Sequence, residues 1–221
     1  MSEINIVADV TELKAGVAVN LDPANTDLVN AYNTLLLDCI VKKNANAEIG
    51  LKCADAAISW LESTDFYTAP ASSIYHEHFK GGLLLHTLKV YNEVIDLLHV
   101  DKFKDVDVVS ASLIALVHDW CKIGMYEQYM KNVKDDKTGQ WNQEVAYKRN
   151  PKGLPLGHGT YSMFLAEKFV KLTPEEACAI NYHMGHWYIS EAEVDDLQRA
   201  NESFPLVHLL QFADQLSIVK Y

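Results

Sequence analysis

The sequence predicts an all-α domain that is interrupted by one β-hairpin. Apolar residues recur three and four positions apart over most of the chain after residue 25, as on one face of an amphipathic helix. Residues 126–147 are instead rich in aromatic and β-branched residues on both sides of a turn-forming Lys-Asp-Asp-Lys-Thr-Gly segment, which is typical of a hairpin. Because the chain shows no internal repeat or low-complexity segment, we expect a single domain over residues 25–221, preceded by an N-terminal arm, residues 1–24.

The expected helices follow one another with short connections. The first begins after a Leu-Asp-Pro-Ala turn signal, and the second carries Cys53 and Leu61 on one apolar stripe. A loop with Pro70 and Gly81-Gly82 separates this pair from the next helix. The periodicity predicts helices at about residues 25–40, 47–62, 83–98, 108–118, 158–171, 173–183 and 205–219.

One of these helices has an explicit start signal. Thr173 can accept a hydrogen bond from the backbone of the first turn, Pro174 suits the first helical position, and Glu176 completes a capping box. We therefore expect a firmly capped helix that carries His183 at its end.

Composition and cysteine usage indicate a globular cytoplasmic protein. Hydrophobic residues make up 49% of the 221 residues. No apolar run approaches the roughly 18 residues needed to cross a bilayer. Residues 1–20 lack the basic flank and apolar block of a secretory signal, so we expect neither membrane insertion nor export. The cysteines form no CxxC motif, which favours buried free thiols; they are Cys39, Cys53, Cys121 and Cys178.

The charge is strongly acidic, with one basic stretch. A net charge of −11 disfavours binding to a long nucleic acid, which is itself a polyanion. From Lys131 to Lys152, six basic residues stand against three acidic ones, which gives +3. This stretch is either solvated loop charge or a patch that faces phosphate.

Several histidines and aspartates lie in apolar helices or at their ends, where an unpaired charge is costly to bury. A metal ion removes that cost, and imidazole together with carboxylate suits zinc, iron, manganese or nickel better than calcium. A single histidine or aspartate in such a place is commonly an ordinary core residue with a hydrogen-bond partner. Taken together, they predict a metal centre inside a helical bundle. The predicted ligands are His86, His118, Asp119, His158, His183 and Asp214.

The sequence around these ligands resembles the HD-domain superfamily of metal-dependent phosphohydrolases. Residues 81–88, Gly-Gly-Leu-Leu-Leu-His-Thr-Leu, look like the first motif. Residues 116–122, Leu-Val-His-Asp-Trp-Cys-Lys, look like the second, with Cys121 where glycine is usual. Leu-Gly-His at residues 156–158 and Ala-Asp at residues 213–214 fit the later motifs.

The resemblance covers about residues 70–221 and is nearest to the HD domain of bacterial YhaM-type 3′-5′ exoribonucleases. Those enzymes carry an OB-like nucleic-acid module ahead of the HD domain, and residues 1–24 are too short for one. The acidic charge also argues against movement along RNA. We therefore expect the HD domain without the exonuclease function.

The resemblance implies an HD-domain helical bundle with divalent metal ions, drawn from Mn, Fe, Ni, Co, Zn or Mg. Members that bind one ion use only His86, His118, Asp119 and Asp214, whereas the presence of His158 and His183 favours two ions. Asp119 would bridge the two ions. The first would be held by His86, His118 and Asp214, and the second by His158 and His183. A metal-activated water would then cleave a phosphoester of a small phosphorylated substrate, which we expect to be a nucleotide.

Other residues near this centre are candidates for contacting the substrate. Lys122 lies one helical turn from His118 and Asp119, so it either points at the same cavity or is a solvated lysine at the helix end. The resemblance implies that it contacts the phosphate. His76 is either a loop-surface residue or a group that protonates the leaving oxygen or holds substrate. The hairpin is expected to act as a lid that brings substrate-binding basic residues to the phosphate; these are Lys148, Arg149 and Lys152.

Two rival functions share the same ligands. Some HD-fold proteins, such as myo-inositol oxygenase, bind two irons with this set and are oxygenases. The other rival is a non-catalytic nucleotide-binding module that keeps a structural metal. A catalytic thiol at Cys121 has no supporting pattern around it.

Overall fold

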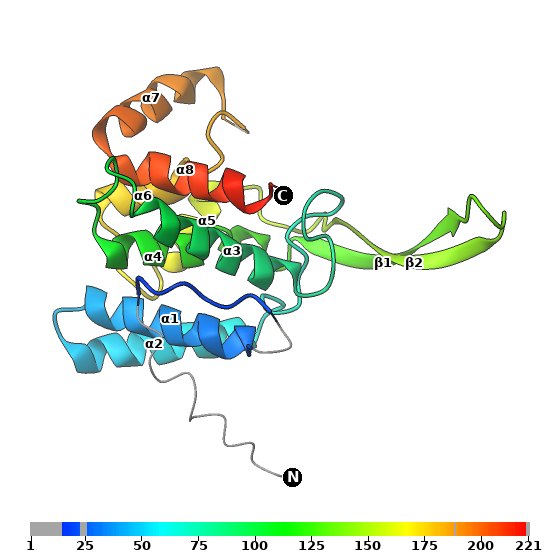
Figure 1. Ribbon diagram of the computed structural model, residues 1–221, viewed down its shortest axis with the longest axis horizontal. Helices are drawn as coiled ribbons and strands as arrows, with labels where there is room; N and C mark the ends of the chain where they lie inside the picture. The colour runs from blue at the N-terminus through cyan, green and yellow to red at the C-terminus, as the bar shows by residue number, and fades with distance from the viewer. Residues whose placement is uncertain (1–14, 23–25, 188, 220–221) are drawn as a thin grey trace, which may run out of the picture.

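The computed structural model describes residues 15–22, 26–187 and 189–219, and over these residues the protein is mainly helical with one antiparallel hairpin (Figure 1). This confirms the prediction of a mainly-α fold with an inserted hairpin. The α-helices are α1 (Leu28–Lys43), α2 (Ala47–Glu62), α3 (Gly82–Leu97), α4 (Val108–Val117), α5 (His158–Ala166), α6 (Pro174–Asn181), α7 (Val194–Ser203) and α8 (Pro205–Ser217). The strands are β1 (Tyr126–Lys134) and β2 (Trp141–Arg149), and short 3-10 helices are η1 (Trp120–Lys122) and η2 (Glu191–Glu193).

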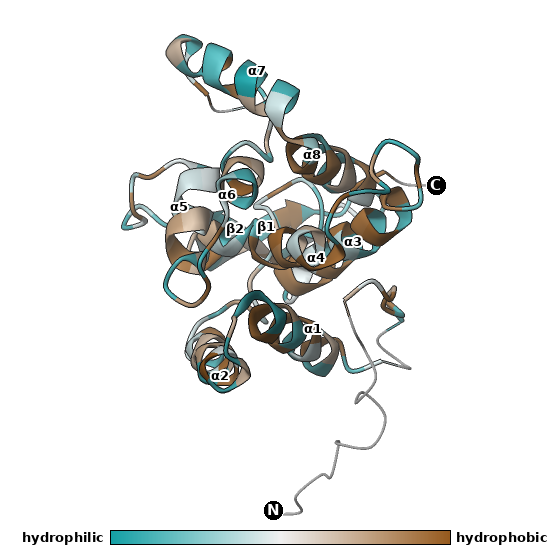
Figure 2. Ribbon diagram, turned by 90° about the vertical axis from the view of Figure 1, so that its left-hand side faces the viewer, coloured by the Kyte–Doolittle hydropathy of each residue, from teal (hydrophilic) through white to brown (hydrophobic). Residues whose placement is uncertain are grey.

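The helices form two groups around one hydrophobic core. α1 and α2 pack against each other, and α1 also contacts α3 and α4 of the second group (Figure 1). In that group α3 packs against α4 and α8, and α6 packs against α8. Figure 2 shows α3, α4 and α8 as largely hydrophobic and α7 as largely hydrophilic. Every residue of α4 from Ala111 to Val117 is buried, so this helix lies at the centre of the domain.

A buried hydrogen-bond chain fastens α1 to the end of α4. The hydroxyl of Tyr32 donates to the carbonyl oxygen of Leu116 at 2.9 Å and accepts from the indole Nε1 of Trp120 at 2.9 Å. Both aromatic side chains are fully buried. Because Leu116 and Trp120 flank residues 118 and 119, this chain holds the turn that carries two of the predicted ligands.

Part of the predicted N-terminal arm packs against the helices. The backbone of Val19 exchanges two hydrogen bonds with the side chain of Asn92, at 2.7 and 2.8 Å. The backbone N–H of Ala15 donates to Asp38 at 2.9 Å, and Val19 is buried. Residues 15–22 are therefore tied to α1 and α3, while residues 1–14 and 23–24 of the arm lie outside the described residues, as does residue 25 at the start of the predicted domain.

Several helix ends differ from the predictions, and three of these differences have a visible structural cause. α1 starts at Leu28, because Asp27 caps it by accepting from the backbone of Asn30. α5 ends at Ala166, since the chain then tightens into a turn that packs Phe169 against Trp60 and Trp120, at ring distances of 5.3 and 6.1 Å. α6 ends at Asn181, so His183 lies just beyond the helix in a turn. The capping box of Thr173 and Glu176 is confirmed, with Pro174 in the first turn.

α7 is a helix that the periodicity did not predict. Its buried residues are Leu197 and Ala200, and Asp195 and Asp196 lie in its first turn. Two apolar positions are too few to give the sequence a recognisable amphipathic pattern. The helix directly precedes α8 in the chain and packs against it.

The hairpin is longer than expected and projects from the helical body (Figure 1). β1 and β2 pair in register from Tyr126 opposite Arg149 to Lys134 opposite Trp141. Tyr147 at the base is buried, whereas most of the remaining hairpin is exposed. None of the described helices is both long enough and apolar enough to cross a membrane.

Candidate metal centre

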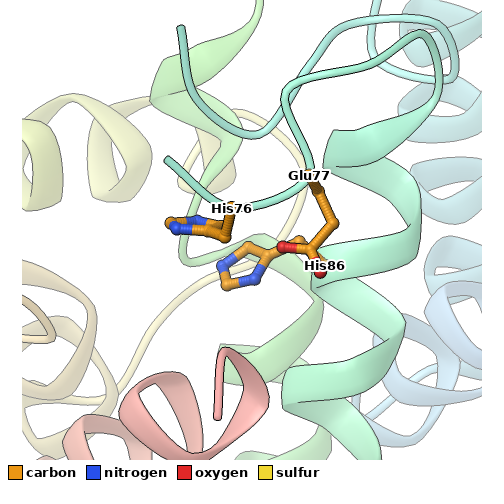
Figure 3. A group of neighbouring side chains, drawn as sticks. All are labelled: His76, Glu77 and His86. Carbon is orange, nitrogen blue, oxygen red and sulfur yellow. The ribbon is translucent and has the colours of Figure 1, made fainter. Parts of the chain in front are cut away.

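The start of α3 places His86 beneath a neighbouring loop. A Cβ on Gly82 would lie 1.9 Å from the carbonyl oxygen of Glu77, so only glycine lets the loop approach the helix this closely. Figure 3 shows the result: the loop brings His76 and Glu77 beside His86. The rings of His76 and His86 have centroids 4.7 Å apart.

The end of α4 places Asp119 at the middle of the cluster. Its Oδ2 lies 3.3 Å from Nε2 of His86 and 3.4 Å from Nε2 of His118, and its Oδ1 lies 3.7 Å from Nε2 of His183. Asp214 on α8 adds a second carboxylate, with Oδ1 at 3.2 Å from Nε2 of His86. Residues from α3, α4, α8 and the turn after α6 thus meet at one buried point.

The start of α5 brings His158 to the same place. A Cβ on Gly159 would lie 2.1 Å from the carbonyl oxygen of Asn181, so glycine allows the first turn of α5 to pack on the end of α6. Nδ1 of His158 lies 3.2 Å from Sγ of Cys121. The ligand atoms of Asp119, Cys121 and His158 all lie within 4.8 Å of one another. All six predicted ligands therefore belong to one cluster.

Backbone carbonyl groups orient two of the imidazole rings. Nδ1 of His118 lies 2.8 Å from the carbonyl oxygen of Ala115, and Nδ1 of His183 lies 2.8 Å from that of Ile180. A carbonyl oxygen can only accept, so each Nδ1 donates its proton. Each Nε2 then carries the lone pair of the neutral ring and points at the carboxylates, which is how metal-binding histidines are usually oriented.

A serine orients the third ring. Oγ of Ser217 donates to the carbonyl oxygen of Asp214 at 2.7 Å and lies 3.4 Å from Nδ1 of His86. Because the hydroxyl donates its hydrogen bond to the carbonyl oxygen, its own oxygen is free to accept a hydrogen bond from Nδ1 of His86. Nε2 of His86 therefore also faces the centre with its lone pair when the ring is neutral.

These Nε2 atoms are buried and lack hydrogen bonds. Nε2 of His86, His118 and His183 has no hydrogen-bond partner among the described residues, although all three side chains are at most 1% exposed. A lone pair that faces a carboxylate oxygen at 3.2–3.7 Å is repulsive unless a cation lies between them or the ring is protonated. The donor set of imidazoles and carboxylates therefore fits a divalent transition metal.

The local electrostatics keep the carboxylates charged. Burial alone would raise the pKa of Asp119, but the Lys122 ammonium and the ring of His118 hold it well below its usual range. Nearby imidazoles likewise outweigh burial at Asp214 and lower its pKa. Burial, reinforced by His118, lowers the pKa of His183 to about 4. At neutral pH these groups are in the states that bind a metal.

Two cations can balance the carboxylates when no metal is bound. Nζ of Lys122 lies 2.5 Å from Oδ2 of Asp119. Burial would lower the pKa of Lys122, but Asp119 outweighs burial and raises it. For His86, too, burial is outweighed by the carboxylates of Asp119 and Asp214, so its pKa lies above the ordinary value.

The two oxygens of Asp119 face different partners. Oδ2 is the oxygen nearer to His86 and His118. Oδ1 is the oxygen near Nε2 of His183, and it also lies 4.0 Å from Sγ of Cys121. The two oxygens of Asp119 thus lie next to different histidines.

His76 lies above the centre with its Nε2 buried and without a hydrogen bond among the described residues. Burial, reinforced by His86, lowers the pKa of His76 to about 4. Glu77 binds Lys89 through Oε1 at 2.5 Å, and its Oε2 is also without a partner among the described residues. The ligand atoms of His76, Glu77 and His86 lie within 4.8 Å of one another.

A cavity of about 200 Å³ adjoins the centre at the base of the hairpin. Its lining includes Cys121, Arg149 and Lys152. Lys148 is not part of this lining; its Nζ lies 3.5 Å from Glu127 across the hairpin, and its side chain is 59% exposed. Of the three predicted basic residues outside the centre, two are at the cavity and one faces solvent.

Three side chains at the centre were not among the predicted site residues. Ser217 lies three residues after Asp214, a spacing that puts both on one helix face and signals a supporting role. Glu77 follows His76 directly. For Cys121 the sequence predicts a buried free thiol, and its contact with His158 reveals that its sulfur faces the cluster.

Comparison with known proteins identifies no relative: the chain matches no family model, no curated protein and no solved structure. The chemistry of the cluster is therefore the basis on which a function has to be argued. That cluster combines a metal-binding donor set, a buried ammonium group and a cavity with basic residues.

Proposed function

We propose that the protein is a metal-dependent phosphohydrolase with an HD-type helical bundle, which cleaves a phosphoester of a small nucleotide-like substrate. One observation carries the proposal. The buried imidazoles of His118 and His183 present unpartnered Nε2 atoms to Asp119, and a third buried ring, His86, lies between the carboxylates of Asp119 and Asp214. A domain that needed only stability would not gather these groups, since each costs free energy to bury without a partner.

The residues fit two divalent ions with Asp119 between them. His86, His118 and Asp214 would hold one ion, and His158 and His183 would hold the other. Divalent ions, when bound, lower the pKa of water towards neutrality and neutralise phosphoryl oxygens. Backbone carbonyl groups accept hydrogen bonds from Nδ1 of His118 and His183, and these bonds orient both rings for metal binding through Nε2.

Lys122 would bind the phosphoryl group. Its ammonium is 2.5 Å from Asp119 and nearly buried, so it lies at the edge of the centre rather than in bulk solvent. A cation in such a place interacts strongly with an arriving anion because little water screens it. The residue would orient the phosphate and stabilise its charge.

His76 would act at the leaving oxygen. Its ring is uncharged at neutral pH, because burial and His86 lower its pKa to about 4. Its Nε2 is unpartnered among the described residues and lies above the ring of His86. From there it can form a hydrogen bond to the leaving oxygen and hold a proton there.

The charge distribution favours a small substrate. The chain as a whole carries −11, which repels a long polyanion. Arg149 and Lys152 nevertheless stand at a cavity of about 200 Å³ beside the centre. A compact phosphorylated molecule can be attracted locally there without placing its length along the acidic surface.

The test begins with metal analysis of the purified protein. It continues with phosphate release from a panel of nucleoside monophosphates, cyclic nucleotides and dinucleotides, with Mn²⁺, Ni²⁺, Co²⁺ or Mg²⁺. We expect bound metal in the wild type and release of phosphate from some members of the panel. His118→Ala and Asp119→Ala should lose both; normal hydrolysis by either variant would refute the assignment.

The same experiment separates the two rival functions. An iron-loaded protein that consumes oxygen and releases no phosphate would be an oxygenase. A protein that retains metal but is inert on every phosphoester and with oxygen would be a non-catalytic binding module. Lys122 and the basic residues at the cavity favour the phosphohydrolase, because an oxygenase does not need a cation for a phosphoryl group.

A further inference from the structure

Cys121 is the residue that sets this cluster apart from the motif it resembles. Its Sγ lies 3.2 Å from Nδ1 of His158 and 4.0 Å from Oδ1 of Asp119. The three ligand atoms form one group within 4.8 Å. The sulfur therefore approaches Oδ1 of Asp119, whereas Nε2 of His86 approaches Oδ2.

The backbone holds this sulfur in place. The N–H of Cys121 donates to Oγ of Ser162 on α5 at 3.0 Å, which links η1 to the helix that starts with His158. Cys121 is 2% exposed. A thiol so enclosed has little access to a disulfide partner or to a bulky electrophile, so its contacts define what it can do.

An independent observation points to a ligand on this side of Asp119. Nε2 of His183 is buried, has no hydrogen bond among the described residues, and lies 3.7 Å from the same Oδ1 that Cys121 faces. The carbonyl oxygen of Ile180 fixes the ring so that its lone pair points there. Two elements thus bring Nε2 of His183 and the thiol of Cys121, which donates a weak hydrogen bond, to a common oxygen.

We propose that Cys121 is a thiolate ligand of the second metal position and gives that position a preference for zinc. This inference rests on the metal centre of the proposed function. The position would combine sulfur from Cys121, nitrogen from His158 and His183, and oxygen from Asp119. Thiolate favours zinc over the harder Mg²⁺ and Mn²⁺ ions, which prefer oxygen donors. Binding of the ion releases the thiol proton to solvent.

The distance between Cys121 and His158 agrees with shared coordination of one ion. With zinc–sulfur and zinc–nitrogen bonds of about 2.3 and 2.0 Å, a tetrahedral ion keeps its sulfur and nitrogen ligands about 3.5 Å apart. Sγ of Cys121 and Nδ1 of His158 are 3.2 Å apart. The two side chains are thus already near the spacing that one ion requires.

The wild-type protein can test the proposal without any variant. X-ray absorption of the zinc-loaded protein should show one sulfur at about 2.3 Å among nitrogen and oxygen ligands. Loading with Co²⁺ should produce a sulfur-to-cobalt charge-transfer band in the near ultraviolet. If zinc has only nitrogen and oxygen neighbours and cobalt gives no such band, Cys121 is not a ligand.

Variants then identify the sulfur. Cys121→Ala, and Cys121→Gly as the second variant, should lose the cobalt band and weaken zinc binding at least about 100-fold at one of two sites. Their affinity for Mn²⁺ should change much less, because that ion gains little from sulfur. Cys53→Ser and Cys178→Ser serve as controls and should retain the band.

The outcomes separate this inference from the proposed function. If the wild type and Cys121→Ala each bind two zinc ions equally tightly, the inference falls while the metal centre stands. If the wild type binds no metal at all, both fall. Retention of the cobalt band in Cys121→Ala would assign the sulfur to another residue and overturn the proposal.

Discussion

The ammonium of Lys122 lies 2.5 Å from Oδ2 of Asp119, and both side chains are almost completely buried. The same oxygen is close to the rings of His86 and His118. A positive charge thus already stands at the oxygen that would bind a metal. When no metal is bound, the lysine is, together with His86, a cation that makes the buried carboxylate tolerable.

Removal of that lysine should therefore destabilise the metal-free protein. Lys122→Met leaves Asp119 buried without its cation, so we expect a loss of about 3 kcal/mol in the free energy of unfolding in the presence of a chelator. Zinc should restore most of the loss. Urea unfolding with and without metal measures both effects.

The control for that experiment is an exposed ion pair. Lys42 contacts Asp38 at 2.7 Å with 41% of its side chain exposed, so Lys42→Met should cost less than about 1 kcal/mol. Equal losses in the two variants would contradict a special role for the Lys122–Asp119 pair.

The stability of the metal-free protein should depend on pH through His183. Burial and His118 lower its pKa from 6.5 to about 4, so the unfolded chain binds a proton that the folded protein does not. Stability from this residue is complete above pH 6.5 and falls as the pH drops towards about 4. Chelator-treated wild type should therefore lose stability over this window more steeply than His183→Asn. Parallel pH profiles would show that His183 does not titrate as described.

The basic residues at the cavity should affect substrate binding more than turnover. Arg149→Gln and Lys152→Gln each remove a cation from the cavity lining, and we expect KM for a phosphorylated substrate to rise about tenfold with kcat nearly unchanged. Added salt should reduce the difference between wild type and variants. Lys137→Gln, at the exposed turn of the hairpin, is the control. An unchanged KM in both cavity variants would remove the cavity from the substrate site.

Ser217 should influence metal binding without touching the metal. Its hydroxyl accepts from Nδ1 of His86 and donates to the backbone of Asp214, so it orients one ligand and tethers another. Ser217→Ala should lower metal affinity about 10- to 100-fold, as loss of such supporting contacts commonly does. Competition with a chromogenic chelator measures the affinity. Ser63→Ala removes a hydroxyl at the end of α2 and should leave the affinity unchanged.

Local sequence patterns predicted the elements that are specified by residues close together in the chain. Such elements include the capping box at Thr173, the turn of the hairpin and the apolar stripes of α3 and α8. α7 escaped prediction because only Leu197 and Ala200 are buried on it. The end of α6 was misplaced because the turn at His183 serves a contact with Asp119, which is distant in sequence.

The sequence by itself determined the mainly helical fold and the choice of residues for the centre, because a histidine or aspartate in an apolar helix is conspicuous against its neighbours. Only the tertiary structure decided how those residues meet. The orientation of His118 and His183 by carbonyl groups, the two-sided placement of Asp119 and the contact of Cys121 with His158 all depend on how separate helices pack. Packing distances of a few ångströms between segments far apart in the chain leave no local pattern, so no reading of the sequence alone could supply them.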